Sequence, residues 1–208
     1  KPANVTIIGG GVVGANAAKM ASGLGADVNI LDINMERLRY LDDVMPNNVR
    51  TIYSNSHNIK SLLKKTDLLV GAVLIVGEKA PNLVNKKMLR LMPKGSVIVD
   101  VAVDQGGCVE TCKATTHKDP TYLVDDILHY CVSNMPGAVS YTSTLALTNI
   151  TLPFVLKICS LGLEKSMASD NRLLNGLNIY KKYVTHEGVA NSFNIKYTDP
   201  SDLIHFDK

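Results

Sequence analysis

Three glycines near the start of the chain, Gly9, Gly11 and Gly14, are spaced as G-x-G-x-x-G. They follow a short β-branched apolar run, residues 5–8, and lead into an alanine-rich segment, residues 15–24. Gly9 would permit a tight turn, Gly11 would let a bulky anion approach the backbone, and Gly14 would let a helix pack closely on the preceding strand. Because the start of a helix offers free N–H groups and a partial positive charge, the pattern predicts a strand, a phosphate-binding turn and a helix.

An acidic residue, Asp32, ends the next apolar run, residues 27–31. Strand, glycines, helix, second strand and terminal acid thus follow in order within about 30 residues, the size of one dinucleotide-binding unit. In such a unit the carboxylate accepts hydrogen bonds from the adenosine ribose and would repel the 2′-phosphate of NADP. We therefore predict NAD as the cofactor, although Arg37 could partly neutralise such a phosphate. The alternative is a glycine turn with a purely structural role.

A second carboxylate, Asp104, follows an apolar run, residues 96–103, and precedes Gln105-Gly106-Gly107. Ligands of doubly wound sheets bind outside the carboxyl ends of the strands, so a carboxylate just beyond a buried strand lies beside the ligand. A positioned carboxylate can exchange protons with a reacting substrate, which makes Asp104 the leading catalytic candidate. The alternative is that Asp104 only caps the turn that follows it.

Other polar residues are more ambiguous. Asn134 follows the last expected strand, residues 129–132, and either binds a nicotinamide or substrate carbonyl or satisfies the turn at Pro136. His129 lies inside that apolar run and is expected to be a hydrogen-bonded core residue. The remaining histidines considered are expected to be solvated: His117, His186 and His205.

The elements that would position these residues alternate between strands and helices. Beyond the glycine unit, strands are predicted at the apolar or alternating runs 49–53, 67–75, 96–103 and 129–132. Helices are predicted at 34–44, 58–65 and 83–92, whereas 105–126 shows little periodicity and is predicted to be a loop. This alternation predicts an α/β fold with a doubly wound parallel sheet of the Rossmann type.

The pattern changes near residue 140, where β-type runs stop and helical patterns take over. A long apolar helix is predicted over 142–161, followed by shorter helices and by a polar tail that frays from Thr198 onward. We therefore predict two domains, a dinucleotide-binding domain over residues 1–140 and a helical segment over residues 141–208.

The composition argues against several classes of partner and site. The 208 residues carry a net charge of only +3, with scattered lysine pairs, three Phe and no Trp, so nucleic-acid binding has little support. Cys108, Cys112 and His117 match no common zinc spacing, so no metal is predicted, and four scattered cysteines suit a reduced, cytoplasmic setting. No continuous apolar run reaches the roughly 18 residues that span a membrane, so no membrane partner is predicted.

Three longer motifs extend this picture: Val-Ile-Val-Asp-Val-Ala-Val-Asp-Gln-Gly-Gly-Cys at 97–108, Thr-Thr-His-Lys-Asp-Pro at 115–120 and His-Tyr-Cys-Val-Ser-Asn-Met-Pro-Gly-Ala-Val at 129–139. Together with the glycine turn and residues 142–149, they resemble the alanine dehydrogenase family over residues 4–193. The resemblance implies an NAD-dependent enzyme that reversibly converts L-alanine to pyruvate and ammonium by oxidative deamination. It also implies a homohexamer.

The resemblance implies that Asp104 is the catalytic aspartate and that cofactor contacts lie at the strand ends. They are Gly9, Gly11, Val12, Val13 and Gly14 at the pyrophosphate, Asp32, Ile33 and Arg37 at the ribose, Ser54 near the adenine, Val73 and Leu74 near the ribose and phosphates, and Val101, Ala102, Val103, Asp104, Val132, Ser133, Asn134 and Met135 around the nicotinamide. Lys113 stands where some members of the family have an arginine near the cofactor.

The family's catalytic histidine, and the arginine and lysine that bind the substrate, lie in an N-terminal part with no counterpart in this sequence. We therefore expect residues 141–208 to belong to an incomplete substrate domain, and the chain alone to bind cofactor without completing catalysis. Two alternatives stay open. One is a transhydrogenase-type subunit, which shares the glycine turn, and the other is a nucleotide-sensing module, which would not need Asp104.

Overall fold

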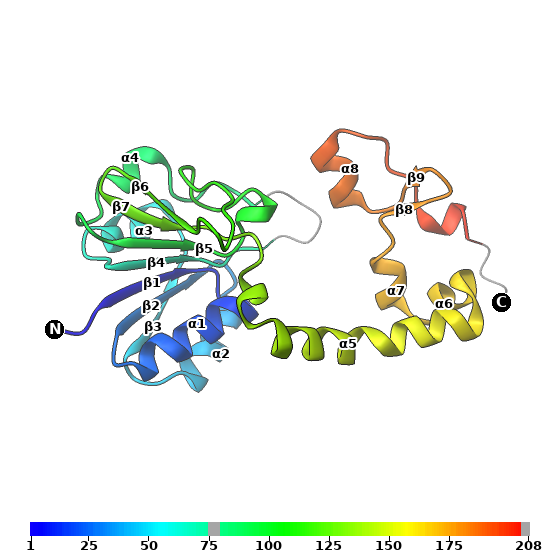
Figure 1. The fold of residues 1–208 in the computed structure, drawn as a ribbon, viewed down its shortest axis with the longest axis horizontal. Coiled ribbons are helices and arrows are strands. Elements are labelled where there is room, and N and C mark those ends of the chain that lie inside the picture. Colours follow the sequence, from blue (N-terminus) through cyan, green and yellow to red (C-terminus); the bar gives the residue numbers. More distant parts are fainter. Residues whose placement is uncertain (75–79, 205–208) are drawn as a thin grey trace. The chain divides into compact units, whose positions relative to one another are not determined.

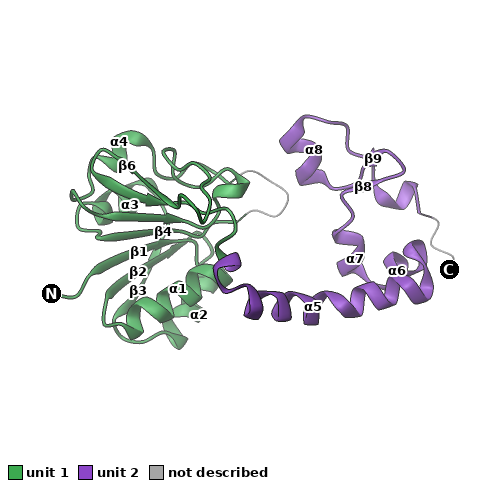
Figure 2. Ribbon diagram, viewed as in Figure 1, with its two compact units in different colours: residues 1–75, 79–135 green, residues 76–78, 136–208 purple. Residues whose placement is uncertain are grey.

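The computed structural model describes residues 1–74 and 80–204. The chain forms two compact units, which divide between Met135 and Pro136, close to the predicted boundary at residue 140 (Figure 2). Unit 1 holds the described residues up to Met135, and unit 2 holds those from Pro136 onward.

Unit 1 is built on a seven-stranded sheet in the order β3-β2-β1-β4-β5-β7-β6 (Figure 1). The strands are β1 (Asn4–Ile8), β2 (Asp27–Asp32), β3 (Val49–Tyr53), β4 (Leu68–Gly71), β5 (Val97–Asp100), β6 (Thr121–Val124) and β7 (Ile127–Tyr130). The helices are α1 (Val12–Gly23), α2 (Met35–Val44), α3 (Ser56–Leu63) and α4 (Lys86–Leu89), with a 3-10 turn, η1 (Val103–Gln105). All neighbouring strands are parallel except β6 and β7, which confirms the predicted doubly wound α/β fold.

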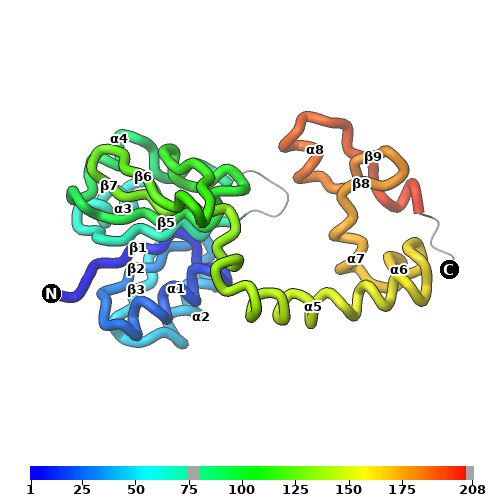
Figure 3. The backbone as a smooth tube through the Cα atoms, in the orientation of Figure 1, coloured from blue at the N-terminus to red at the C-terminus, as the bar shows by residue number. Residues whose placement is uncertain are grey.

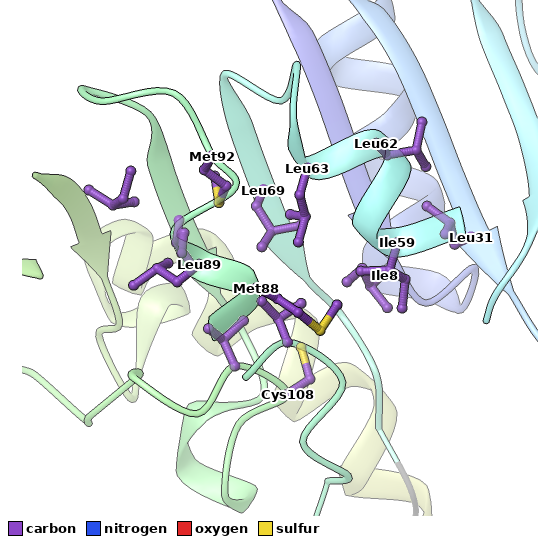
Figure 4. Packing of buried hydrophobic residues seen from close by; sticks show 14 residues of the cluster. Ile8, Leu31, Ile59, Leu62, Leu63, Leu69, Met88, Leu89, Met92 and Cys108 are labelled. Carbon is purple, nitrogen blue, oxygen red and sulfur yellow. The ribbon is translucent and has the colours of Figure 1, made fainter. Parts of the chain in front are cut away.

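Alternate strand residues build a core on each face of this sheet. Ile7 belongs to a cluster with Ala18 of α1 and Leu41 of α2. Its neighbour Ile8 belongs to a second cluster with Leu63 of α3, which Figure 4 shows. A strand buried on both faces must be apolar at consecutive positions, which is the pattern the sequence shows. The chain crosses from one face to the other after β3, as its path in Figure 3 shows, and this crossing creates the switch point at which ligands bind in such folds.

Several boundaries differ from the sequence predictions. The helix predicted at 83–92 is a single turn, α4, and the strand predicted at 67–75 ends at Gly71; Ile75 lies outside the described residues. The loop predicted at 105–126 contains a strand, β6, which pairs with β7 through a two-residue turn at Asp125 and Asp126. Both aspartates have positive φ, 51° and 62°, a conformation that Asp tolerates better than most residues and that tight hairpins require.

Unit 2 contains α5 (Ser140–Leu161), α6 (Leu163–Ser169), α7 (Asn171–Asn175), α8 (Glu187–Phe193), the hairpin β8 (Ile179–Tyr180) and β9 (Tyr183–Val184), and the 3-10 turn η3 (Pro200–Asp202). A 3-10 segment, η2 (Met135–Val139), precedes α5. The tail was predicted to fray from Thr198 onward, but residues 198–204 are held in place, because the N–H of Thr198 donates to the carbonyl of Val184 and Ile204 is buried.

The helical stretch Met135–Leu161 is long and apolar enough, by length and composition, to cross a membrane, with a mean hydropathy of 1.5 over its most apolar 18 residues. The prediction considered only uninterrupted apolar runs and therefore missed this stretch. Serine, threonine and asparagine interrupt the run without making its mean hydropathy low. Length and composition alone are weak indications of a membrane span, since an apolar helix covered by other protein has the same character.

Candidate cofactor and catalytic site

The carboxyl ends of the parallel strands lie along one edge of the sheet, with β1 and β4 as neighbours at the switch point. The glycine turn follows β1, and residues 72–74 follow β4. These two segments touch, because a Cβ added to Gly9 would lie 2.5 Å from the carbonyl oxygen of Ala72. The order of the strands therefore brings together most of the residues that the sequence nominated.

The glycine turn is shaped by close backbone contacts. Gly9 has a φ of +105°, and its N–H donates to the carbonyl of Leu31 at 2.8 Å. A Cβ on Gly14 would overlap the carbonyl oxygen of Gly9, so α1 can pack against the turn only with glycine there. A Cβ on Gly11 would meet nothing within 4 Å, so the backbone at that position is open to an incoming group.

Helix α1 starts beside this open backbone. Gly11 is its N-cap and provides no side-chain hydrogen bond to the first turn. Val12, the first helical residue, is 78% exposed, and Val13 is also exposed. The first N–H groups of a helix have no partner within the helix, so this end of α1 can bind the oxygens of an anion such as a phosphate.

Asp32 holds the glycine turn at the end of β2. Its Oδ2 accepts a hydrogen bond from the N–H of Gly10 at 2.7 Å, and its Oδ1 accepts one from the N–H of Asn34 at 2.8 Å. Arg37 braces the same turn from α2, because its Nε donates to the carbonyl of Gly10 at 2.6 Å. The Arg37 guanidinium also lies over the Tyr40 ring. The sequence did not predict that Asp32 and Arg37 both hold the backbone of the turn.

Four further predicted residues follow the ends of β2, β3 and β4. Ile33 is 71% exposed. Ser54 follows β3, and its N–H donates to the carbonyl of Asp32 at 2.9 Å. Val73 and Leu74 follow β4, with Val73 half-buried and Leu74 exposed.

The loop after β5 presents Asp104 to solvent. Val101 is half-buried, Ala102 and Val103 are buried, and Asp104 is exposed within η1. Asp100, the last residue of β5, is fully buried, and burial raises the pKa of its carboxyl above the usual range. Sequence reasoning did not single out Asp100, because it lies inside an apolar run.

The segment after β7 is tied to the loop before β6. The N–H of Ser133 donates to the carbonyl of Thr115 at 3.3 Å, and the N–H of Thr115 donates to the carbonyl of Cys131. His117 Nε2 donates to the carbonyl of Asn134 at 2.6 Å. His117 is exposed, as the sequence predicted, and its ring also has this specific partner. Of the other residues nominated here, Val132 is buried and Met135 is half-buried.

His186 and His129 also have defined surroundings. His186 caps α8 by accepting from the N–H of Val189, whereas His205 lies outside the described residues. His129 Nδ1 donates to the carbonyl of Ile127 at 3.0 Å, so in the neutral ring Nε2 accepts from the Thr111 hydroxyl at 2.8 Å. Burial lowers the pKa of His129, and its buried, hydrogen-bonded place confirms the prediction of a core histidine.

Lys113 is held beside the outermost strand. Its N–H donates to the hydroxyl of Tyr122 in β6 at 2.6 Å, and its side chain is exposed. Among the described residues, no hydrogen bond or ion pair links Lys113 with the glycine turn. The structure therefore does not connect Lys113 with the glycine turn, and its role at the cofactor stays a prediction.

The cysteines are all free thiols. A hydrogen bond from the Cys112 thiol lowers the pKa of Cys131 to about 7. Across residues 1–74 and 80–204, no group of three or more His, Cys, Asp or Glu side chains is arranged to hold a metal ion.

Relatives of known identity cover almost the whole chain. The family described as alanine dehydrogenase/PNT, C-terminal domain, matches residues 1–187. The alanine dehydrogenase of Halomonas elongata is 50% identical over 203 residues, which cover 98% of this chain and 55% of that protein. The alanine dehydrogenase of Methanococcus maripaludis is 54% identical over 199 residues, which cover 95% of this chain and 53% of that protein.

Solved structures agree with these relatives. An L-alanine dehydrogenase matches with a TM-score of 0.82 and 52% identity over 93% of this chain and 54% of that chain. A transhydrogenase from Sinorhizobium meliloti matches with a TM-score of 0.62 and 28% identity over 70% of this chain and 41% of that chain. The chain spans about half the length of the curated relatives it matches. Because the family match extends over residues 1–187, the chain belongs to the family of alanine dehydrogenase/PNT C-terminal domains.

Proposed function

We propose that this chain supplies the cofactor-binding half of an enzyme that converts L-alanine reversibly to pyruvate and ammonium by oxidative deamination. The observation that carries the proposal is the placement of Asp104. This exposed carboxylate follows β5 at the sheet edge where the glycine turn follows β1. A module that only senses a nucleotide has no use for a proton-exchanging group at that edge.

NAD is the cofactor of this domain, and the residues present fit it. The open backbone at Gly11 and the uncapped start of α1 suit a pyrophosphate, and the carboxylate of Asp32 suits a ribose hydroxyl. We propose that the cofactor is held by the residues that the sequence nominated: Gly9, Gly11, Val12, Val13, Gly14, Asp32, Ile33, Arg37, Ser54, Val73, Leu74, Val101, Ala102, Val103, Asp104, Lys113, Val132, Ser133, Asn134 and Met135.

The chemistry divides between the cofactor and the chain. When bound, NAD would supply the acceptor for the hydride that leaves the Cα of alanine. In our proposal Asp104 places a negative charge beside that carbon as it becomes electron-poor, and exchanges a proton with the water that adds to it. The loops after β5 and β7 hold the reacting groups at contact distance, which is itself a large part of the rate enhancement.

The groups that bind the carboxylate of alanine are expected in the remaining half of the full-length protein. We propose that residues 1–140 form the NAD-binding domain and that residues 141–208 join the substrate domain. We further propose a cytoplasmic homohexamer without nucleic-acid or membrane partners, in which other protein covers the exposed apolar side chains of α5.

A transhydrogenase-type subunit is the second candidate, because the Sinorhizobium meliloti transhydrogenase shares this fold at 28% identity. About half of the matched positions are identical in this chain and in alanine dehydrogenases, which favours the first proposal. The two candidates differ in whether an amino acid takes part in the reaction.

The test uses the full-length protein that contains this chain. We expect NADH oxidation that requires both pyruvate and ammonium, and NAD reduction that requires L-alanine. Failure to turn over any of these substrates would contradict the proposal. Hydride exchange between two nucleotides without an amino acid would favour the transhydrogenase-type candidate instead.

A further inference from the structure

The buried carboxylate of Asp100 is the feature of unit 1 that the proposed chemistry leaves unused. Asp100 ends β5, four positions before Asp104, and none of its surface is exposed. It is not at the ligand edge itself, since the loop from Val101 to Val109 folds over it. A carboxylate is costly to bury unless its oxygens are hydrogen-bonded, so its partners indicate its purpose.

Those partners are three backbone N–H groups of the loop and, at 4.0 Å from Oδ1, the thiol of Cys108. Oδ1 accepts from Ala102 at 3.1 Å, and Oδ2 accepts from Cys108 at 2.9 Å and from Val109 at 3.2 Å. One carboxylate thus binds the loop on both sides of Asp104. The two anchored points fix the ends of the segment that carries the exposed side chain.

The surroundings leave the carboxylate little freedom to move. A Cβ on Gly71 would lie 3.0 Å from Asp100 Oδ1, and a Cβ on Gly107 would lie 2.8 Å from Oδ2. Two glycine backbones therefore press against it from β4 and from the loop. Gly107 has a φ of +68°, so the loop also needs a glycine there to turn back toward Asp100.

We propose that Asp100 is a positioning residue, which holds the Val101–Val109 loop in the shape that presents Asp104 to the substrate. This inference rests on the proposed function, because it assigns Asp100 a role through Asp104. Asparagine cannot replace the carboxylate fully. It offers one oxygen and one NH₂ group, so at least one loop N–H would face a second donor.

The test compares variants of the full-length protein. Asp100→Asn should lower kcat for alanine oxidation about 10- to 100-fold while NADH affinity stays within about threefold, because a misplaced catalytic group costs rate more than cofactor binding. Asp125→Asn is the matched control. It removes a carboxylate from the exposed β6–β7 turn, where Asp125 lies near Arg90, and should leave kcat unchanged.

A double variant separates positioning from general stability. If Asp100 acts through Asp104, then Asp100→Asn should cost no more than about threefold in the Asp104→Asn background, because residues that act as a unit are not additive. If Asp100→Asn lowers kcat as much in the Asp104→Asn background as in the wild type, the proposal is overturned. So would a kcat for Asp100→Asn within about threefold of the wild type.

Hydrogen exchange gives a readout that does not depend on the reaction. The N–H groups of Ala102, Cys108 and Val109 should exchange faster in Asp100→Asn and at the wild-type rate in Asp125→Asn. Unchanged exchange would refute the anchoring by Asp100. If the full-length wild type does not oxidise alanine, the proposed function fails, and if Asp104→Asn keeps wild-type turnover, only the catalytic role of Asp104 fails. In both cases the exchange rates still decide whether Asp100 anchors the loop.

A second variant covers the case in which Asp100→Asn does not fold. Gly107→Ala pushes a methyl group against Asp100 Oδ2 from the loop side. It should show the same pattern of lowered kcat, retained NADH affinity and faster exchange at Cys108 and Val109. Wild-type turnover and exchange in a folded Gly107→Ala protein would also overturn the proposal.

Discussion

Asp104 lies in an exposed turn in which aspartate and asparagine would serve almost equally well as caps. The Asp104→Asn change in the full-length protein therefore preserves the turn and removes a group that can gain or lose a proton. We expect kcat for alanine oxidation to fall about 10²- to 10⁴-fold, with NADH affinity within about threefold. Steady-state kinetics and NADH titration check this, and turnover within about threefold of the wild type would assign Asp104 a structural role.

Asp32 should set the preference between the two nicotinamide cofactors. Its carboxylate lies at the glycine turn, and the nearby Arg37 Nε is already bonded to the carbonyl of Gly10. A 2′-phosphate would meet a like charge, a contact that costs a few kcal/mol. We therefore expect NADH to bind about 100-fold more tightly than NADPH, as measured by calorimetric titration.

The cofactor preference can be tested with a variant and a matched control at the two ends of β2. Asp32→Asn should narrow the difference between NADH and NADPH, because it removes the charge beside the ribose. Asp27→Asn removes a carboxylate from the opposite end of β2 and should leave the difference unchanged. Equal or tighter binding of NADPH by the wild type would refute this role of Asp32.

Helix α1 offers two glycines that should respond in opposite ways to the same change. A methyl group on Gly14 would overlap the carbonyl oxygen of Gly9, whereas one on Gly23 would meet nothing within 4 Å. Gly14→Ala should lower the free energy of unfolding by about 1–3 kcal/mol and weaken NADH binding, because α1 must move away from the turn. Gly23→Ala should be neutral or stabilise by about 0.5–1 kcal/mol. Denaturant unfolding and NADH titration distinguish the two, and similar effects would contradict the packing argument.

The β6–β7 hairpin should make stability depend on pH through His129. Burial lowers the pKa of this imidazole, which is hydrogen-bonded in its neutral form and stacks on Tyr122. The unfolded chain binds the proton more readily, so the contribution of His129 is complete above its unfolded pKa of about 6.5 and is lost as the pH falls through the lower folded value.

The test compares unfolding free energies of the wild type and His129→Gln between pH 5 and 7.5. The wild type should lose stability relative to the variant as the pH falls, because glutamine does not titrate. Asp100 makes the opposite contribution to the pH dependence of stability, because its raised pKa favours the protonated form in the folded protein. This contribution is the same in the wild type and in His129→Gln, so it cancels when the two unfolding free energies are subtracted. A constant difference over this range would contradict the buried neutral imidazole.

The parallel strands could be predicted from sequence because they are buried on both faces and therefore apolar at consecutive positions, as Ile7 and Ile8 are. Strand β6 could not, since it is four residues long with alternating exposure and ends in an acidic turn. The helix predicted at 83–92 is only one turn long. At its predicted start, the backbone N–H groups of Leu83 and Val84 donate to the carbonyl of Cys108 and not to carbonyls of a helix.

The residues of the site also divide into those that the sequence could predict and those that it could not. Residues that follow strands, such as Asp32 and Asp104, could be nominated because the fold sends all parallel strand ends to one edge. The loop anchor Asp100 and the bond from His117 to Asn134 could not, because each depends on how distant loops fold back. Sequence spacing shows which residues reach an edge, but not which backbone groups they meet there.

The whole chain exposes apolar side chains that a stable protein would cover. Along α5, Leu147 is 64% exposed and Ile150 is 68% exposed. We expect the isolated 208-residue chain to bind NADH, to show no alanine turnover, and to associate through this helix, because contiguous exposed apolar surface drives association. Light scattering after gel filtration measures the association, and alanine-dependent NADH production by this chain would refute the prediction.

Two variants locate the associating surface. Ile150→Lys places a charge on α5 and should shift the isolated chain toward the monomer. Leu24→Lys adds the same charge at an exposed position after α1 and should not. Binding of the chain to phospholipid vesicles, lost in Ile150→Lys, would contradict a covering by protein and indicate a lipid surface instead.

The same helix carries a built-in attachment point for a reporter dye. Of the four free thiols, Cys108 and Cys131 are buried, Cys112 is half-buried, and Cys159 on α5 is exposed. A maleimide should therefore label Cys159 first, and without a reducing agent two chains could become crosslinked there. The labelling rate then measures occlusion: it should be fast for the isolated chain and slow wherever the rest of the enzyme shields that stretch of helix.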